Sequence, residues 1–200
     1  MTATIDLVFN PDHAADPQAT IQRAIDAMPQ DEFGAFALPR NEPLVGQVAY
    51  QRWLAKSPSA QLAVDLTQDF SVPVVLLSII SEDESLAVRF ADKFWAVINA
   101  DEEVLLGPDA LVARAAQPQA TPADLVRAAI SEKANYNREL HQTIRRSLAK
   151  PEKAWREAAA KGAALAGWPE LAADLGNALA KEKDPEIRRM LQMAQHKVQG

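Results

Sequence analysis

The chain has 200 residues, of which 48% are hydrophobic and 24% are charged, a balance typical of one soluble globular domain. It contains no cysteine, which excludes disulfide frameworks, zinc fingers, iron–sulfur clusters and thiol catalysis. The formal net charge is −6, and the pI near 5.1 argues against general nucleic-acid binding.

The sequence carries no signal for export or for a membrane. The N-terminus lacks the basic and apolar regions of a signal peptide. The longest apolar run, residues 74–77 followed by Ile79 and Ile80, is far short of the ~20 residues that a membrane span needs. We therefore expect a cytoplasmic protein with no membrane partner.

Two short segments near the N-terminus favour extended structure. In residues 4–9, the apolar side chains Ile5, Leu7 and Phe9 alternate with others along the chain, and residues 33–38 form a second candidate. The two segments predict a short N-terminal strand or, if they pair, a hairpin.

Proline marks the start of most other predicted elements. At the first helical position its missing N–H is not needed and its fixed φ already suits the helix. Prolines precede amphipathic runs at residues 17, 43, 58, 108, 122, 151, 169 and 185. Together with helical spacing of apolar residues, they predict helices over residues 17–28, 43–56, 58–69, 82–99, 108–116, 121–149, 151–166, 169–181 and 185–198. Residues 73–80 fit a buried strand or a buried helical turn, and their neighbours favour helix.

Two capping boxes and one glycine indicate where helices begin and end. Ser81 followed by Glu84 matches a capping box, and Thr121 with Asp124 matches a second one. A helix from Thr121 to about residue 149 would be roughly 40 Å long, with Tyr136 in its buried stripe. Gly167 is placed to end a helix in the left-handed conformation.

These elements predict an all-α fold. We expect residues 1–200 to form a single-domain, irregular multi-helix bundle whose C-terminal half consists of stacked helix pairs. Charge is unevenly spread: residues 1–110 hold 17 acids and 6 bases, whereas residues 111–200 hold 10 acids and 15 bases. This asymmetry suggests a subdivision into an acidic helical part, 1–117, and a basic helical stack, 118–200.

The C-terminal quarter resembles a HEAT-like helical repeat. Helix starts recur there at Pro151, Pro169 and Pro185, so that a helix pair occupies about 34 residues. The resemblance rests on the alanine-rich segment around Trp155 and on the Asp-Pro-Glu-Ile-Arg-Arg start at Asp184, and it covers residues 151–198. It implies stacked helix pairs that offer a face to a protein partner, and it implies no chemistry.

No motif predicts catalysis, a metal or a cofactor. The three histidines, His13, His141 and His196, share no helical turn, so no histidine pair can chelate a metal. Glycine-rich phosphate loops and a nucleophile elbow are both missing. We therefore expect no enzyme activity and no cofactor, although an enzyme with an unrecognised site stays open as an alternative.

Three sets of residues are candidates for partner binding. Arg138, His141 and Arg145 share one helix face, and residues 138–161 hold seven bases against three acids. Such a face fits a phosphate, an acidic partner or nucleic acid, or it is a solvated face with interleaved ion pairs. The full candidate set is Arg138, His141, Arg145, Arg146 and Lys153 on this face, Glu82, Asp83, Glu84, Asp101, Glu102 and Glu103 in the acidic half, and Trp168 as an interface anchor.

The leading hypothesis is a non-enzymatic protein-interaction module. A bacterial immunity or antitoxin-like inhibitor, or an adaptor in a secretion or other macromolecular assembly, fits this description. A basic partner would dock on the acidic half by charge complementarity. The alternative is binding of nucleic acid or a phosphate ligand through the basic face. The sequence leaves the partner's identity and the oligomeric state open.

Overall fold

In the computed structural model the chain divides into two compact units, Met1–Leu106 and Gly107–Gly200. We refer to them as unit 1 and unit 2 and describe each by itself. The structure describes residues 2–13, 16–37, 40–45, 48–57, 60–69, 73–133 and 135–199, with only the backbone described for 40–45. Unit 1 carries 16 acidic and 6 basic residues, whereas unit 2 carries 11 acidic and 15 basic residues.

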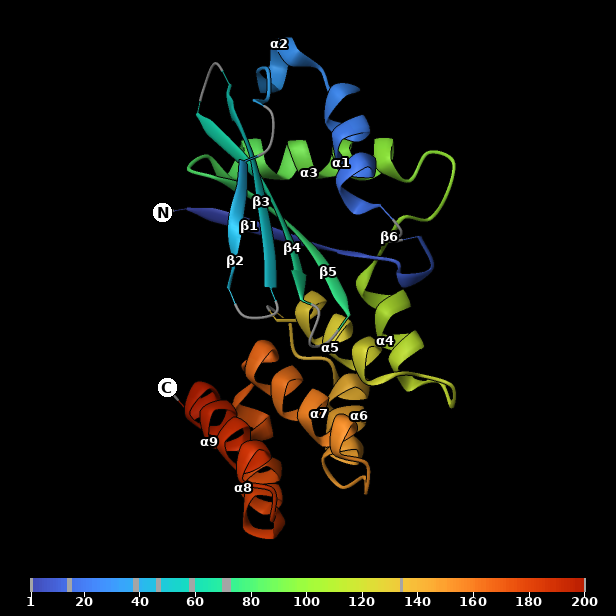
Figure 1. Ribbon diagram of the computed structural model, residues 1–200, viewed down its shortest axis with the longest axis vertical. Helices are drawn as coiled ribbons and strands as arrows, with labels where there is room; N and C mark the ends of the chain where they lie inside the picture. Colours follow the sequence, from blue (N-terminus) through green and yellow to red (C-terminus); the bar gives the residue numbers. More distant parts are fainter. Residues whose placement is uncertain are drawn as a thin grey trace. The chain divides into compact units, whose positions relative to one another are not determined.

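Unit 1 combines an antiparallel sheet with helices (Figure 1). Its six strands run in the order β2-β3-β4-β5-β1-β6, and every strand pair is antiparallel. The elements in chain order are β1 (Ala3–Phe9), the 3-10 helix η1 (Pro11–His13), α1 (Pro17–Asp26), α2 (Gln30–Phe33), β2 (Arg40–Val45), β3 (Val48–Lys56), β4 (Gln61–Asp69), β5 (Val74–Ser81), α3 (Glu84–Ile98) and β6 (Leu105–Leu106).

The core of unit 1 lies between one face of the sheet and helices α1 and α3. Trp53, Val64 and Ile79 lie opposite one another on β3, β4 and β5, and all three are fully buried. Phe90 of α3 packs against them within the same cluster. The Trp53 indole donates a hydrogen bond of 2.8 Å to the side chain of Gln22, so its polar atom is satisfied inside the core.

Unit 2 is built of helices packed through small side chains. Its elements are α4 (Pro108–Ala116), α5 (Pro122–Ser131), α6 (Arg138–Leu148), α7 (Lys153–Ala166), the 3-10 helix η2 (Pro169–Leu171), α8 (Ala172–Lys181) and α9 (Pro185–Gln199). A Cβ added at Gly162 of α7 would lie 3.4 Å from the Ala129 side chain of α5. The alanine-rich α7 therefore approaches α5 closely, with buried alanines lining the contact.

The prediction of an all-α fold is wrong, because unit 1 contains the sheet. The described residues of segments 43–56 and 58–69 lie in or next to strands β2, β3 and β4 rather than in helices, and β5 takes up residues 74–80 of segment 73–80. Residues 46, 47, 58 and 59 lie outside the described residues. Leu62 and Leu66 are four apart, a spacing that suits both a helix and one face of a strand. The ladder decides between the two: Val64 pairs with Trp53 of β3 and Ile79 of β5, and it is fully buried on the same face as the two leucines.

The long helix predicted over 121–149 is two helices, α5 and α6. Asn137 begins the second one: its side chain accepts hydrogen bonds from the backbone N–H groups of Glu139 and Leu140. Tyr136 consequently lies in the connection and is 49% exposed, not in a buried stripe. The missed signal was the asparagine, a residue that favours the position before a helix.

Some of the other local predictions are confirmed and others are wrong. The N-terminal strand is confirmed as β1, which pairs with β5 and β6. Of the second candidate, residues 33–38, Phe33 ends α2, Phe36 forms an isolated bridge with Ala55 of β3, and residue 38 lies outside the described residues. The second capping box is confirmed at Thr121 and Asp124. The first is wrong, since Asp83 caps α3 by accepting from the Leu86 N–H. Gly167 ends α7 with φ of +67°, as predicted.

Adjacent leucines of β5 test the strand assignment. Leu77 is fully buried in the core face, and Leu76 is half-buried on the opposite face. We expect Leu77→Ala to lower the free energy of unfolding by about 2–5 kcal/mol, because it leaves a cavity among packed side chains. Leu76→Ala should lower it by less than half as much. Urea denaturation followed by tryptophan fluorescence measures both, and equal losses would contradict the assignment.

Candidate binding groove

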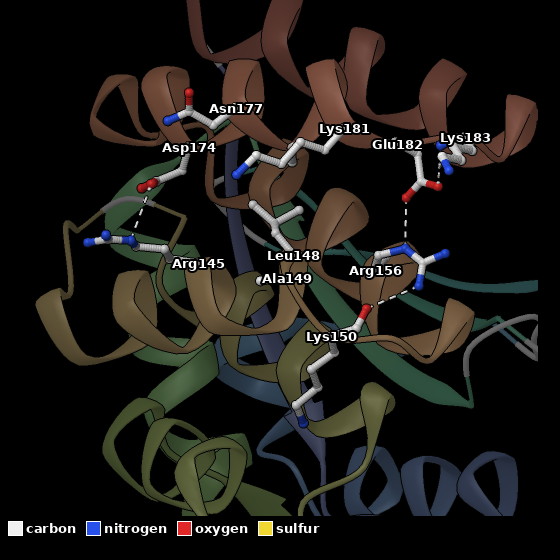
Figure 2. Close-up of a pocket in the computed structure, with 11 residues that line it drawn as sticks. Arg145, Leu148, Ala149, Lys150, Arg156, Asp174, Asn177, Lys181, Glu182 and Lys183 are labelled. Carbon is white, nitrogen blue, oxygen red and sulfur yellow. Dashed lines mark hydrogen bonds and ion pairs between the residues drawn. The ribbon is translucent and has the colours of Figure 1, made fainter.

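Unit 2 contains a groove of about 790 Å³ that α6, α7, α8 and their adjoining loops line (Figure 2). We call it the α6–α8 groove. Its wall is mostly polar and rich in cationic side chains. The lining residues are Arg145, Leu148, Ala149, Lys150, Arg156, Asp174, Asn177, Ala178, Lys181, Glu182 and Lys183.

The amphipathic pattern of α6 places Arg145 on the groove side. Leu140, Ile144 and Leu148 recur every four residues and are buried. Arg145 follows Ile144 by one position, so it lies at the flank of this apolar stripe. Its side chain is 71% exposed and reaches the groove.

Asp174 closes one end of the groove. This residue lies in the first turn of α8, where a negative charge is favoured by the helix dipole. One carboxylate oxygen lies 2.9 Å from His141 Nε2, and the other lies 3.5 Å from Arg145 Nε. His141 Nδ1 lies 2.9 Å from the Tyr136 hydroxyl. A single carboxylate thus ties α8 to two side chains of α6.

Arg156 and Glu182 form the opposite end. Arg156 Nε donates to Glu182 at 2.7 Å, and Arg156 Nη1 donates to the carbonyl of Lys150. Glu182 also accepts hydrogen bonds from the backbone N–H groups of Asp184 and Lys183. The bond from Asp184, followed by that from Arg156, lowers the pKa of the Glu182 carboxyl below its usual value.

Between these two ends the groove has uncompensated positive charge. Figure 2 shows the Lys181 side chain extending from α8 over Leu148, whereas the Lys150 side chain points away from the groove. The Lys150 ammonium stacks on the Trp155 ring, 3.2 Å from its centroid. Within the described ranges of the chain, the side chain of Lys181 has no hydrogen-bond or ion-pair partner. This ammonium is therefore available to an anionic group.

The basic residues predicted for partner binding do not form one surface. Lys153 contacts the carboxylates of Glu157, Asp184 and Glu186, which raise the pKa of its ammonium. Arg146 donates to the Gln142 carbonyl and the Thr143 hydroxyl of its own helix. Arg138 is exposed in the first turn of α6, and His141 is half-buried behind Asp174. Of the five predicted residues, Arg145 alone lines the groove.

The predicted acidic residues lie in two groups at opposite ends of α3. Glu82, Asp83 and Glu84 lie at its start and Asp101, Glu102 and Glu103 beyond its end. Its 15 residues separate the groups by about 22 Å at ~1.5 Å per residue. Asp83 serves as the helix cap, and Glu102 pairs with His13 at 3.0 Å. The two groups therefore do not form one acidic face.

Trp168 is 5% exposed, so it is not available as an exposed interface anchor. Its ring packs against Tyr136 with 5.2 Å between ring centroids and an interplanar angle of 66°. Trp168 thus supports the connection between α5 and α6 from inside unit 2.

Besides the groove of unit 2, a polar cluster lies in unit 1, on the sheet face opposite its core. Asp65 accepts two hydrogen bonds from Arg52, of 2.7 and 2.6 Å, and a third from the Tyr50 hydroxyl. Burial and the Asp65 carboxylate raise the pKa of Tyr50 above its ordinary value. On β5 and β1, Ser78 donates to Asp6 at 2.6 Å. The donors and acceptors of these side chains pair with one another, which is typical of polar groups that stabilise a sheet.

Asp174, Lys181, Glu182 and Lys183 were missed by sequence reasoning as groove residues. Lys181 lies in the last turn of α8, where a cation is favoured by the helix dipole whether or not it binds a ligand. Asp174 and Lys181 are seven residues apart, two helical turns, and so share one face of α8. This spacing was the available signal, but the sequence did not show that α6 faces it.

The described part of the chain shows neither a metal site nor a membrane-spanning helix. In the part of the chain that the structure describes, no group of three His, Asp or Glu side chains is placed to hold a metal ion. None of the helices described is both long and apolar enough to cross a membrane. The chain matches no protein-family model, no curated protein and no solved structure. The groove geometry is therefore the basis for a functional proposal.

The Glu182 end of the groove makes stability depend on pH. A carboxyl whose pKa is lowered in the folded state stabilises the fold above its unfolded pKa, near 4.5 for glutamate, and loses this effect as the pH falls through the folded value. We expect Glu182→Gln to lower the thermal midpoint at neutral pH. The difference from the wild type should shrink as the pH falls below 4.5. Circular dichroism at several pH values measures both.

Glu170→Gln is the control for this experiment, since Glu170 is exposed in η2 and outside the groove. It should leave the midpoint nearly unchanged throughout. A Glu182→Gln difference that stayed constant between neutral and acid pH would show that the ion pair with Arg156 does not act as described.

Proposed function

We propose that the chain is a non-enzymatic protein-interaction module whose α6–α8 groove binds an acidic segment of a partner protein. A cytoplasmic adaptor or an immunity-type inhibitor would use such a groove. The observation that carries the proposal is the Lys181 ammonium, which lies above Leu148 and has no hydrogen-bond or ion-pair partner among the residues that the structure describes. An acidic side chain of a partner would supply the missing counter-charge.

The charges around Lys181 favour an anionic ligand. Arg145 keeps a long contact of 3.5 Å to Asp174 and is mostly exposed, so its remaining N–H donors can bind a second carboxylate. Asp174 is already shared between Arg145 and His141. A carboxylate that entered the groove could therefore bind Arg145 and Lys181, and the charge of the nearby Asp174 is already balanced by its own contacts.

The shape of the groove favours a peptide over a compact ion. Its volume of about 790 Å³ is in the range of pockets that hold a ligand of many atoms. The two ion-paired ends leave the apolar floor of Leu148, Ala149 and Ala178 between them. A short segment that alternates acidic and small apolar residues would match this sequence of surfaces.

The experiment compares a glutamate-rich peptide with a glutamine peptide of the same length. We expect the glutamate peptide to bind the wild type more tightly at about 0.15 M salt, where the Debye length is about 8 Å and distant charges are screened. The double variant Arg145→Gln/Lys181→Gln should weaken its binding about tenfold or more, which corresponds to about 1.4 kcal/mol. Isothermal titration calorimetry measures the affinities.

A second double variant, with the same net charge as the first, is the matched control. Arg189→Gln/Lys197→Gln removes two exposed cations of α9 that do not line the groove. It should leave peptide affinity within about twofold of the wild type, because screened charges outside a binding site contribute little. Equal weakening in both double variants would contradict a specific site in the groove. Tighter binding of a single-stranded oligonucleotide, lost with Arg145 and Lys181, would favour the nucleic-acid alternative instead.

A further inference from the structure

Three side chains of unit 2 form a continuous hydrogen-bonded chain beside the groove. The Tyr136 hydroxyl lies 2.9 Å from His141 Nδ1, and His141 Nε2 lies 2.9 Å from the Asp174 carboxylate. They come from the α5–α6 connection, from α6 and from α8. The order is a carboxylate, an imidazole and a hydroxyl, in which a carboxylate orients a base and the base contacts a nucleophile.

The direction of the proton transfer follows from the carboxylate. An ionised Asp174 only accepts hydrogen bonds, so a neutral His141 ring carries its proton on Nε2 and donates it to Asp174. Nδ1 is then the acceptor, and the Tyr136 hydroxyl donates to it. His141 is thus placed to remove the phenolic proton. The other charged group that faces this assembly is Arg145, through its contact with Asp174.

Tyr136 is both held and accessible. Its ring meets the His141 ring edge-on, with 5.7 Å between centroids and an interplanar angle of 84°, and it also packs against Trp168. These two contacts orient the hydroxyl toward Nδ1. The residue is nevertheless 49% exposed, so a reagent in solution can reach it.

The chain's other tyrosine lacks this activation. Tyr50 is the second of two tyrosines, and its hydroxyl donates to the Asp65 carboxylate on the sheet of unit 1. Burial and that carboxylate raise the Tyr50 pKa, which opposes loss of its proton. Tyr136 instead donates to an imidazole, which becomes a cation when it takes the proton and stabilises the phenolate.

We propose that Tyr136 is a covalent modification site, a nucleophile that accepts an acyl group from an activated acyl donor. The phenolic oxygen forms a bond to the acyl carbon, and the bond from that carbon to the leaving group breaks. The phenolic proton passes to His141 Nδ1, and the leaving group departs with the bonding electron pair. The product is an O-acyl tyrosine, and no oxidant or reductant takes part.

N-Acetylimidazole is the probe, and peptide mass spectrometry of the full-length chain reads acetylation at Tyr136 and Tyr50 separately. A general base contributes roughly 10²- to 10⁴-fold in enzymes, and we expect Tyr136 to react at least about tenfold faster than N-acetyltyrosine amide. Tyr50 should react more slowly than this free compound.

Two variants test the role of the imidazole. His141→Gln should slow acetylation of Tyr136 about tenfold or more. Asp174→Asn, which no longer fixes the Nε2 proton, should slow it as well. His196→Gln on α9 is the matched control and should leave the rate unchanged. Circular dichroism confirms that each variant is folded.

Tyr136 reacting no faster than the free tyrosine compound would overturn the proposal, as would a folded His141→Gln variant with the wild-type rate. Should His141→Gln fail to fold, the comparison of wild-type Tyr136 with the free compound still decides. The outcome is independent of the peptide-binding experiment, because acetylation is measured without a peptide.

Discussion

The arrangement of the groove depends on one carboxylate, Asp174. It lies on α8, and its two oxygens contact His141 and Arg145, which are one helical turn apart on α6. This contact fixes which face of α8 is turned to α6 and so places Lys181, two turns further along α8, over the apolar floor.

The polar cluster on the sheet of unit 1 and the α6–α8 groove differ in how their charges are balanced. On the sheet of unit 1, Asp65 accepts from both Arg52 and Tyr50, and each donor has its acceptor within the cluster. In the α6–α8 groove, the carboxylates at the two ends are each occupied, and Lys181 stays without a partner in the described part of the chain. A satisfied cluster stabilises a fold, whereas an unsatisfied cation on an accessible wall gives a ligand something to bind.

Features that depend on a few neighbouring residues could be predicted from the sequence, whereas features that depend on distant residues could not. The helix starts at Pro17, Pro108, Pro122 and Pro185, the capping box at Thr121 and the left-handed Gly167 depend on a few neighbouring residues, and all were predicted. The same proline signal was wrong at Pro43, which lies in strand β2. The sheet of unit 1 was missed because its strands also carry apolar residues on the second face, such as Tyr50 and Leu54 of β3. Apolar residues on both faces blur the alternation that identifies a strand.

The groove could not be predicted for a different reason. Arg145 and His141 were recognised as a basic face of α6, but their meaning depends on Asp174, some thirty residues away in the sequence. The break between α5 and α6, which Asn137 caused, also turned Tyr136 from an expected core residue into an exposed one. Sequence spacing describes one helix at a time, and the site arises where helices meet.

Nuclear magnetic resonance mapping of an acidic peptide on the isotopically labelled protein tests the account most directly. We expect glutamate peptide to shift the side-chain signals of Arg145 and Lys181 and the amide signal of Asn177, all of which line the groove. Lys197 on α9 should stay unchanged. Shifts spread evenly over exposed lysines and arginines, or confined to residues outside the groove, would contradict the account.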